Sequence, residues 1–455
     1  MAHERPPMTA PIDRRLSQTI ELLQELIRNA CVNDGSPGSG EEWRSADILQ
    51  GFLEGTDLDL ERYEPTPGRT SLVARLEGSD PHAPTLCLMG HTDVVPVSLA
   101  GWSREPFGGE LIDGEIWGRG AVDMLNLTSS MAVALRHLAS SGWRPRGTVI
   151  YLAVADEEAG GVHGAKWLSA HARDAISCDL VVTESGGWTV PGVRGPRVVV
   201  TVGEKGVAWR RLRVRGRPGH GSRPYGADNA VVKAAEVIRR ISAYEPKARI
   251  SESWRAYLEG LAVEDEVREG LLDPARFAET CAGLPDQRFA SYAHACTHTT
   301  LSPNVVFGGT KTNVIPDEVV IELDARILPG DDVGTVDRIL RELLGPLGAE
   351  VVVESISERE GSESPFDTPL MDALQRVVHR VYPDATLLPR VTPGATDAPF
   401  FREMGAVAYG FGLLSRSITA EDFSARFHGN DERIDVESLR LTTEAWLALC
   451  EDVAG

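Results

Sequence analysis

Three short apolar segments of the chain each end at side chains that can bind a metal ion. The first is followed by His91, the second by three successive carboxylates at 156–158, and the third by Glu184. Short apolar runs bounded by turn residues predict buried strands, and in an open α/β sheet functional groups collect at the carboxyl ends of the strands. The chain is therefore expected to bring imidazole and carboxylate groups together at one edge of a sheet. The three segments are Leu86–Met89, Thr148–Ala155 and Cys178–Thr183.

Each of these polar residues also has a plain structural explanation. His91 and Asp93 could be ordinary loop residues, and Asp123, which precedes a helical pattern at Leu127–Leu138, could be only a helix cap. A run of carboxylates such as 156–158 usually lies on a solvated surface. Directly after an apolar strand these carboxylates would repel one another, and a bound cation that offsets the repulsion explains them better. Because metal-binding side chains recur at the ends of three predicted strands, one metal site explains them better than a separate structural role for each.

Composition limits the domain count, the partners and the compartment. The chain has 455 residues, so two or more domains are expected. Its formal net charge of −21 argues against nucleic acid or an anionic membrane as the main partner. No stretch approaches the roughly 18 apolar residues of a membrane span, and no signal peptide is recognisable. Six cysteines without C-x-x-C spacing fit free thiols, so a cytoplasmic enzyme is expected.

The sequence pattern changes at about Val198 and again near residue 360. Outside this stretch, apolar strands alternate with amphipathic helices, which predicts an α/β domain with a mainly parallel sheet. Within it, runs that alternate with period two, such as Val198–Gly216, predict an inserted α+β domain with an antiparallel sheet. The predicted ranges are 1–199 and 360–455 for the α/β domain and 200–359 for the inserted domain.

Periodicity assigns most of the chain to elements. Gly101–Gly120 shows little periodicity and is expected to be a long functional loop, while residues 245–300 are expected to hold polar helices. A helix is predicted over Asn229–Tyr244. Its apolar stripe is Val232, Ala235, Ile238 and Ile241. The other predicted helices are Ile12–Ile27, Glu41–Leu53, Val336–Leu347, Pro369–Tyr382 and Val436–Leu449, and the other strands are Thr70–Leu76, Thr299–Gly308, Glu318–Ile327 and Gly405–Gly410.

Five residues supply candidate metal-binding groups, two imidazoles and three carboxylates. With Asp123 as a bridge, this set suits two Zn²⁺ ions about 3.5–4 Å apart, each keeping a position for water or substrate. A water between two such ions is acidified and becomes a hydroxide nucleophile. Co²⁺ or Mn²⁺ would also fit mixed nitrogen and oxygen ligands. The five residues are His91, Asp123, Glu158, Glu184 and His428.

Two further acidic residues have predicted roles beside the metal. Glu157 cannot ligate from the same direction as Glu158, so it is predicted to be the general base that later protonates the departing amine. Asp93 is predicted to orient His91. Competing chemistries are poorly supported, because the chain has no G-x-S-x-G, G-x-x-x-x-G-K-[ST] or H-E-x-x-H motif.

Five separated motifs stand in an order that is known from one family. They are HTDVVP, GRGAVDM, DEEAGG, the strand-end Glu184 and the late HGNDE. In these motifs the chain resembles the dinuclear-zinc aminoacylase and carboxypeptidase family, which includes glutamate carboxypeptidase, acetylornithine deacetylase, succinyl-diaminopimelate desuccinylase and the aminoacylases. The resemblance implies a zinc-peptidase-like catalytic domain. It also implies one zinc held by His91, Asp123 and Glu184, and another held by Asp123, Glu158 and His428.

The resemblance also implies roles for the inserted domain, as a lid that forms a homodimer. His220, in GRPGHGS, stands where the family has a histidine that reaches the partner's active site and stabilises the oxyanion. Asn313 and Arg326 match lid residues that hold the substrate's carboxylate, a task that suits a guanidinium. Gly394, in the GATDAP loop, is a further predicted substrate contact. Taken alone, His220 and Asn313 could be turn residues and Arg326 a surface charge.

Two positions depart from the family pattern. Leu125 stands where the family often has a lysine, and Pro399 replaces an arginine that is frequent in the acetylornithine and succinyl-diaminopimelate branches. The second change weakens the case for small acidic substrates. The segment 245–300 is expected to shape a larger acyl pocket.

The sequence therefore predicts a homodimeric two-zinc hydrolase that cleaves the amide bond of N-acyl amino acids or small peptides with a free carboxylate. One alternative is a small-substrate deacetylase or desuccinylase of amino-acid biosynthesis. Another is a catalytically inactive binding protein of the same fold, against which the intact Glu157 and the full ligand set argue.

Overall fold

The computed structural model describes residues 14–455, which form two compact units. The helix predicted from residue 12 is observed as α1. Residues 12 and 13, and the N-terminal residues in which no signal peptide was recognised, lie outside the described part. The unit bounds lie within a few residues of the predicted ones, apart from 389–395, which was predicted in the α/β domain and belongs to unit 2. Unit 1 consists of the described residues up to Val200, Pro365–Leu388 and Thr396–Gly455, and unit 2 of Thr201–Ser364 and Pro389–Ala395.

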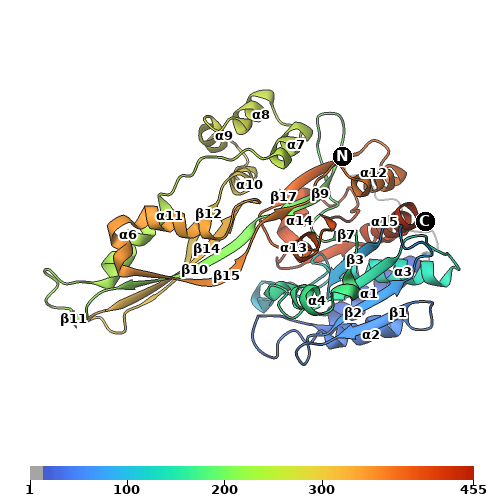
Figure 1. The fold of residues 1–455 in the computed structure, drawn as a ribbon, viewed down its shortest axis with the longest axis horizontal. Helices are drawn as coiled ribbons and strands as arrows, with labels where there is room; N and C mark the ends of the chain where they lie inside the picture. The colour runs from blue at the N-terminus through green and yellow to red at the C-terminus, as the bar shows by residue number, and fades with distance from the viewer. Residues whose placement is uncertain (1–13) are drawn as a thin grey trace. The chain divides into compact units, whose positions relative to one another are not determined.

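Unit 1 is built on a sheet whose central strands are parallel, as the sequence predicted (Figure 1). β3 pairs in parallel with β6 on one side and β7 on the other, and β18 pairs in parallel with β7. β2 and β1 continue the sheet as antiparallel strands. β3 and β6 are buried along their whole length, so continuous apolar runs encode them. In spatial order the strands are β1 (Asp59–Tyr63), β2 (Ser71–Leu76), β6 (Val149–Val154), β3 (Leu86–His91), β7 (Leu180–Thr183), β18 (Val407–Gly410) and the start of β9 (Arg197–Glu204).

Helices cover both faces of this sheet. On one face α1, α3 and α15 pack against one another, and α3 contacts β3. On the other face α4, α5 and α13 pack on the sheet through a buried cluster that includes Ile150, Leu168 and Phe401. The carboxyl ends of β3, β6 and β7 are thereby held between two rigid layers. The helices of unit 1 are α1 (Arg14–Asn29), α2 (Trp43–Leu53), α3 (Leu125–Ser140), α4 (Ala165–His171), α5 (Arg173–Ile176), α12 (Pro369–Val381), α13 (Ala398–Glu403), α14 (Ala420–Arg426) and α15 (Val436–Ala454).

The segment Gly101–Gly120 was predicted to be an irregular loop, and this was wrong for its second half. β4 and β5 form a hairpin there, and β5 also pairs with β19. The hairpin turns at Asp113–Gly114, where both residues have positive φ (51° and 81°), the conformation that Asp-Gly turns adopt. The strands are too short to show periodicity. Their bounds are β4 (Glu110–Ile112), β5 (Glu115–Trp117) and β19 (Arg433–Asp435).

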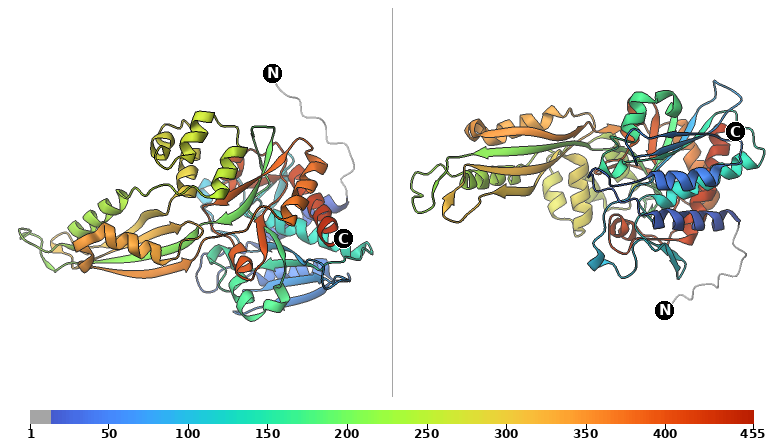
Figure 2. Two further views of the ribbon diagram at one scale, coloured as in Figure 1. Left: turned by 45° about the horizontal axis from the view of Figure 1, so that its top comes forward. Right: turned by 90° about the horizontal axis from the view of Figure 1, so that it is seen from below.

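Unit 2 contains the predicted antiparallel sheet (Figure 2), whose strands, labelled in Figure 1, follow the order β12-β14-β10-β15. Burial alternates along β14, and the buried side chains form a core with α6 and α11. The run Val198–Gly216 is two strands rather than one. Its first strand, β9, is buried almost throughout and begins in unit 1. The elements are β10 (Gly206–Arg215), β11 (Gly219–His220), β12 (Thr300–Gly308), β13 (Val314–Ile315), β14 (Glu318–Ile327), β15 (Val351–Arg359), β16 (Ser362–Glu363), α6 (Ala230–Ser242) and α11 (Gly334–Leu344).

The predicted apolar stripe of α6 was largely wrong. The buried residues are Ala230, Ala234, Val237 and Ile241, whereas Val232 is 65% exposed. The Asn229 side chain caps the helix by accepting a hydrogen bond from the Val231 N–H, and this sets the phase of the first turn. Val232 then points away from the core, although its hydrophobicity suggested the opposite.

Residues 245–300 hold helices, as predicted, and these enclose their own aromatic core around Trp254 and Phe277. The same segment explains why 389–395 belongs to unit 2. The hydroxyl of Tyr292 and the thiol of Cys296 both donate to the carbonyl oxygen of Val391. The helices are α7 (Glu252–Gly260), α8 (Asp265–Leu272), α9 (Phe277–Ala282) and α10 (Gln287–Thr297).

All six cysteines are free thiols. Within residues 14–455, none of the helices combines the length and the apolar character that crossing a bilayer requires.

Candidate metal centre

His91 is the last residue of β3 and is buried at the carboxyl edge of the sheet. Its Nδ1 lies 2.9 Å from the main-chain oxygen of Asp93, to which it donates, so Nε2 is the atom that faces the carboxylates. The carboxylate of Asp93, predicted to orient this ring, is farther away at 3.5 Å. Asp93 thus holds His91 through its carbonyl oxygen, and its carboxylate makes other contacts.

Asp123 lies just before α3 and is buried between two imidazoles. Its Oδ1 is 3.2 Å from Nε2 of His91, and its Oδ2 is 2.8 Å from Nε2 of His428. Burial alone would raise the pKa of this carboxyl, but hydrogen bonds from His428 and His91 hold the pKa well below its usual range. One carboxylate oxygen directed at each imidazole is the arrangement that a bridging ligand of two ions requires.

Three glutamates complete the group. Glu157 and Glu158 lie in a short 3-10 turn after β6, and Glu184 follows β7 directly. Burial raises the pKa of Glu158, and it raises the pKa values of Glu157 and Glu184 well above their ordinary values. Oε1 of Glu158 is buried and has no hydrogen-bond partner among the described residues. The two imidazoles offset the charge of these carboxylates only in part, which is the electrostatic setting of a cation site.

The donor atoms form three overlapping groups, and within each group all of them lie within 4.8 Å of one another. Two groups share Asp123 and match the two ligand sets that the resemblance implies. In the third, Oε2 of Glu157 lies 3.9 Å from Nε2 of His91, so the predicted base reaches the same space as the ligands. Imidazole and carboxylate donors fit Zn²⁺, Co²⁺ and Mn²⁺. The groups are His91–Asp123–Glu184, Asp123–Glu158–His428 and His91–Glu157–Glu158.

His428 is the most exposed member of the centre, with 47% of its side chain accessible. Hydrogen bonds to Asp123 and Glu158 raise its pKa to about 10. Its ring stacks on Phe427 with centroids 4.9 Å apart; Phe427 makes a tilted contact with Phe423 at 5.7 Å, and Phe423 stacks on Trp188 at 4.4 Å. These aromatic rings support the imidazole from one side.

A buried ion pair joins the loops that carry Asp123 and His428. Nη1 of Arg119 lies 2.6 Å from Oε2 of Glu432, and Oε1 of Glu432 accepts the N–H groups of Val122 and Asp123 at 2.6 and 3.0 Å. Nη2 of Arg119 donates to the carbonyl oxygen of His428 at 3.2 Å. Both residues of the pair stand in the motifs GRGAVDM and HGNDE, but no sequence signal links one to the other.

In unit 2, the structure brings His220 and Asn313 together. β11 and β13 pair, and the Gly221 N–H donates to the carbonyl oxygen of Asn313 at 2.8 Å. Nδ1 of His220 accepts the N–H of Ser222 at 3.2 Å, so Nε2 carries the proton of the neutral ring. His220 therefore presents an exposed hydrogen-bond donor, the form that an oxyanion requires.

Arg326 and Gly394 have less distinctive surroundings. The guanidinium of Arg326 is 2.8 Å from Oδ1 of Asp324 and lies over the Trp209 ring, 5.5 Å from its centroid. The carboxylate of Asp324 thus already accepts a hydrogen bond from this guanidinium. The Gly394 N–H donates to Oγ1 of Thr392 at 3.3 Å. Substrate binding by either residue remains a prediction.

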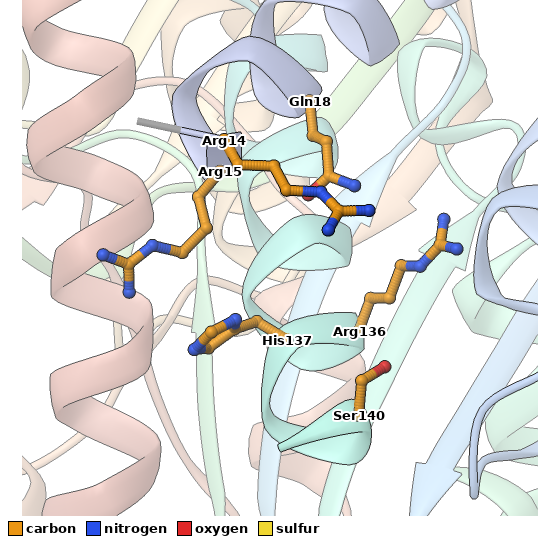
Figure 3. A pocket seen from close by; sticks show the side chains of 6 residues that line it. All are labelled: Arg14, Arg15, Gln18, Arg136, His137 and Ser140. Carbon is orange, nitrogen blue, oxygen red and sulfur yellow. The ribbon is translucent and has the colours of Figure 1, made fainter. Parts of the chain in front are cut away.

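A separate concavity of about 480 Å³ lies in unit 1 where α1 meets α3 (Figure 3). It is rich in guanidinium groups and contains one imidazole but no carboxylate, so it lacks the donor set of a metal centre. Its lining residues are Arg14, Arg15, Gln18, Arg136, His137 and Ser140.

The model of peptidase family M20/M25/M40 matches residues 87–452, and the chain belongs to this family. The resemblance inferred from the five motifs is thereby confirmed. Members of this metallohydrolase family cleave amide bonds, and the chain is such an enzyme.

Individual relatives cover nearly the whole chain. It is similar to aminoacylase-1 of Mus musculus, with 27% identity over 90% of each chain. It is also similar to succinyl-diaminopimelate desuccinylase of Gluconacetobacter diazotrophicus, with 28% identity over 98% of this chain and 100% of the relative. The structure of the M20 family metallo-carboxypeptidase Sso-CP2 from Sulfolobus solfataricus shares the fold, with a TM-score of 0.70, 18% identity and coverage of 97% and 99%.

Proposed function

We propose that the protein is a dinuclear metal amidohydrolase that cleaves N-acyl amino acids or small peptides with a free carboxylate. One observation carries this proposal. Asp123 lies between His91 and His428 with one oxygen toward each, so two donor groups share a single bridging carboxylate. The named relatives, aminoacylase-1 and succinyl-diaminopimelate desuccinylase, support an acylated amino compound as the substrate class.

The residues present fit two metal ions. His91 and Glu184 would hold one ion and Glu158 and His428 the other, with Asp123 shared between them. Bound Zn²⁺ ions would polarise the substrate carbonyl and acidify a water molecule between them. The uncompensated Oε1 of Glu158 and the raised pKa values of the buried glutamates support a doubly charged occupant.

Glu157 is the proposed general base. Its carboxylate lies at the mouth of the donor groups, 12% exposed, and burial raises its pKa well above the ordinary value. A carboxylate with a raised pKa accepts a proton from water more readily and can return it to the departing amine. The Glu157 N–H donates to the carboxylate of Asp93, which fixes the main chain at this residue.

His220 is the proposed donor to the substrate's carbonyl oxygen, supplied from the partner subunit of a homodimer. Exposed apolar residues at the edge of unit 2 support an interface there. Val306 and Phe307 are 51% and 60% exposed on β12, which is an edge strand, and Val231 and Val232 are 46% and 65% exposed on α6. An exposed apolar edge strand is a favourable surface for pairing with a second chain.

Deacylation of small substrates in amino-acid biosynthesis is the second candidate, because the desuccinylase relative is matched over its full length. Pro399 opens α13 where that branch often carries an arginine, which favours acyl groups other than succinyl. The free cysteines support a reducing compartment, and we propose the cytoplasm.

A substrate panel tests the proposed function. Purified enzyme loaded with Zn²⁺ is incubated with N-acetyl, N-succinyl and N-long-chain-acyl amino acids and with dipeptides, and the released amine is measured. We expect hydrolysis of substrates with a free α-carboxylate and none of their methyl esters. Hydrolysis of no amide by zinc-, cobalt- or manganese-loaded enzyme would contradict the proposal.

Mixed dimers test the crossed active site. His220→Ala and Glu157→Gln subunits are each expected to be inactive, and mixing them should restore part of the activity because one site in the heterodimer has both residues. Absence of recovery after subunit exchange, verified by mass spectrometry, would contradict the role of His220.

A further inference from the structure

We propose that Asn33 and Arg69 are positioning residues, which hold Asp93 in the orientation that sets the main chain of Glu157 and Glu158. The N-terminal loop 33–42 and Arg69 then form a buried brace behind the metal centre. This inference rests on the proposed function, since it concerns the base and one ligand of the same site. It gives a role to a polar loop to which the sequence assigned none.

The carboxylate of Asp93 is the point at which the brace meets the site. Its Oδ1 accepts the Glu157 N–H at 3.3 Å, and its Oδ2 accepts the Glu158 N–H at 3.0 Å. Oδ2 also accepts a hydrogen bond from Nδ2 of Asn33 at 2.8 Å. One fully buried carboxylate thus fixes two consecutive peptide groups, and its own orientation depends on Asn33.

The orientation of the Asn33 amide is determined by its neighbours. Nη2 of Arg69 lies 3.0 Å from one amide atom and the Gly35 N–H lies 3.1 Å from the same atom. Both neighbours can only donate, so this atom is the oxygen. The amide nitrogen therefore faces the two carboxylates of Asp93 and Asp156, at 2.8 and 3.2 Å.

Arg69 is held in turn by a second buried carboxylate. Its Nη1 lies 2.7 Å from Oε1 of Glu42 and 3.5 Å from Oδ1 of Asp156. Oε1 of Glu42 also accepts the Asp156 N–H at 3.2 Å. The side chains of Arg69 and Glu42 are only 7% and 0% exposed, so their contacts are not exchanged for water, and charge-assisted hydrogen bonds of this kind are the stronger ones.

The loop is shaped to admit this guanidinium. A Cβ atom at Gly40 would lie 2.0 Å from Nη1 of Arg69, and Gly40 has a φ of +86°. The glycine leaves the space that Arg69 fills, and it also takes the left-handed conformation that turns the chain back toward Glu42.

The contacts form one continuous path from Arg69 through Asn33 and Asp93 to the base. The path has one arginine for the three carboxylates of Glu42, Asp93 and Asp156. Without the Asn33 amide, Asp93 and Asp156 would face each other with no donor between them. We therefore expect Asp93 to rotate, and the peptide groups of Glu157 and Glu158 to lose their acceptor.

The test compares Asn33→Ala with Asn29→Ala. Asn29 also makes a partly buried hydrogen bond, to Oγ of Ser45, but has no contact with the brace. In Asn33→Ala we expect kcat to fall by about 10- to 100-fold, the range for partners that orient metal-site residues, with KM within about twofold of wild type. We expect the amide protons of residues 157 and 158 to exchange with deuterium at least tenfold faster. Asn29→Ala should change neither.

Two further variants keep the test decisive if Asn33→Ala does not fold. Asn33→Ser retains a short polar group that cannot reach both aspartates, and Arg69→Lys keeps the charge but cannot donate to Asn33 and Glu42 together. Both should show the same split between kcat and KM. A folded variant with lower thermal stability but wild-type kcat and wild-type exchange at 157 and 158 would overturn the proposal. If the wild type hydrolyses no amide, the proposed function fails, and the exchange measurement alone decides on the brace.

Discussion

Replacing Glu432 with glutamine tests the buried ion pair that joins the two loops of the metal centre. In the wild type, Glu432 accepts from Arg119 with one oxygen and from the Val122 and Asp123 N–H groups with the other. Glutamine keeps the shape but has one acceptor oxygen and no charge. Either Arg119 or the peptide groups before α3 must lose their partner.

The expected magnitude follows from the burial of the pair. The Arg119 and Glu432 side chains are 3% and 0% exposed, and removing one partner of a buried ion pair typically costs about 3–5 kcal/mol. We therefore expect the metal-free protein to lose about 3 kcal/mol in its free energy of unfolding, which lowers Tm by ~5 °C for a unit of the size of unit 1. The Asp123 N–H and the His428 carbonyl oxygen would no longer be held by Glu432 and Arg119. Affinity for the metal ion expected at Asp123, Glu158 and His428 should therefore fall by about 10- to 100-fold.

The assay measures each effect separately. Thermal unfolding in the presence of a chelator gives the stability, and competition with a zinc-binding dye gives the two metal affinities. Glu437→Gln is the matched control, because Glu437 pairs with Arg440 at 52% and 36% exposure and an exposed pair contributes at most about 1 kcal/mol. Wild-type zinc affinity in Glu432→Gln, combined with lower stability, would refute the link between this pair and the metal centre.

Three other predictions concern buried charge, metal and loop shape. Burial lowers the pKa of Lys205 from its ordinary value of 10.5 to about 7, so between these pH values the folded chain holds a neutral amine and the unfolded chain binds one more proton. Wild-type stability should therefore rise by ~1.4 kcal/mol per pH unit in this range relative to Lys205→Met, as measured by chemical denaturation, and equal slopes would contradict the lowered pKa. Dialysis against a chelator should abolish amide hydrolysis and lower Tm, with both restored by Zn²⁺; full activity without any bound metal would exclude a metal mechanism. Gly40→Ala should lower Tm and kcat because the methyl group displaces Arg69, and a wild-type kcat would show that the loop adjusts freely.

The parts of the site that the sequence revealed are those placed by regular structure. His91 ends one apolar strand and Glu184 directly follows another, so the rule that parallel strands end at one edge of a sheet is enough to place them together. Fold class and family were predictable for the same reason, since strand periodicity and five ordered motifs are local signals.

Side-chain networks were not predictable, because their partners are distant in the sequence. Arg119 and Glu432 are 313 positions apart, and Asn33 lies 60 positions from Asp93. No local pattern connects such pairs. The hydrogen bond from Nδ1 of His91 to the main-chain oxygen of Asp93 was not predicted, because residue types in a sequence indicate side-chain contacts only. The Asp93 carboxylate was therefore expected to orient His91.

The errors in the fold have similar causes. β4 and β5 are three residues long each, which is too short for a period-two signal. On α6, the strong hydrophobicity of Val232 outweighed the weaker signal of Ala230 and Ala234, which face the core. Burial of small residues leaves little trace in a hydrophobicity pattern.

In the proposed function, Glu157 acts as general base beside two metal ions that the two histidines, Asp123, Glu158 and Glu184 hold. The most direct measurement compares wild type and Glu157→Gln for bound zinc per subunit and for single-turnover hydrolysis of the best substrate of the panel. We expect about two zinc ions in both proteins, and a rate lower by about 10²- to 10⁴-fold in the variant, the range that general acid–base catalysis supplies. Wild-type turnover in Glu157→Gln with its zinc retained would contradict the claim.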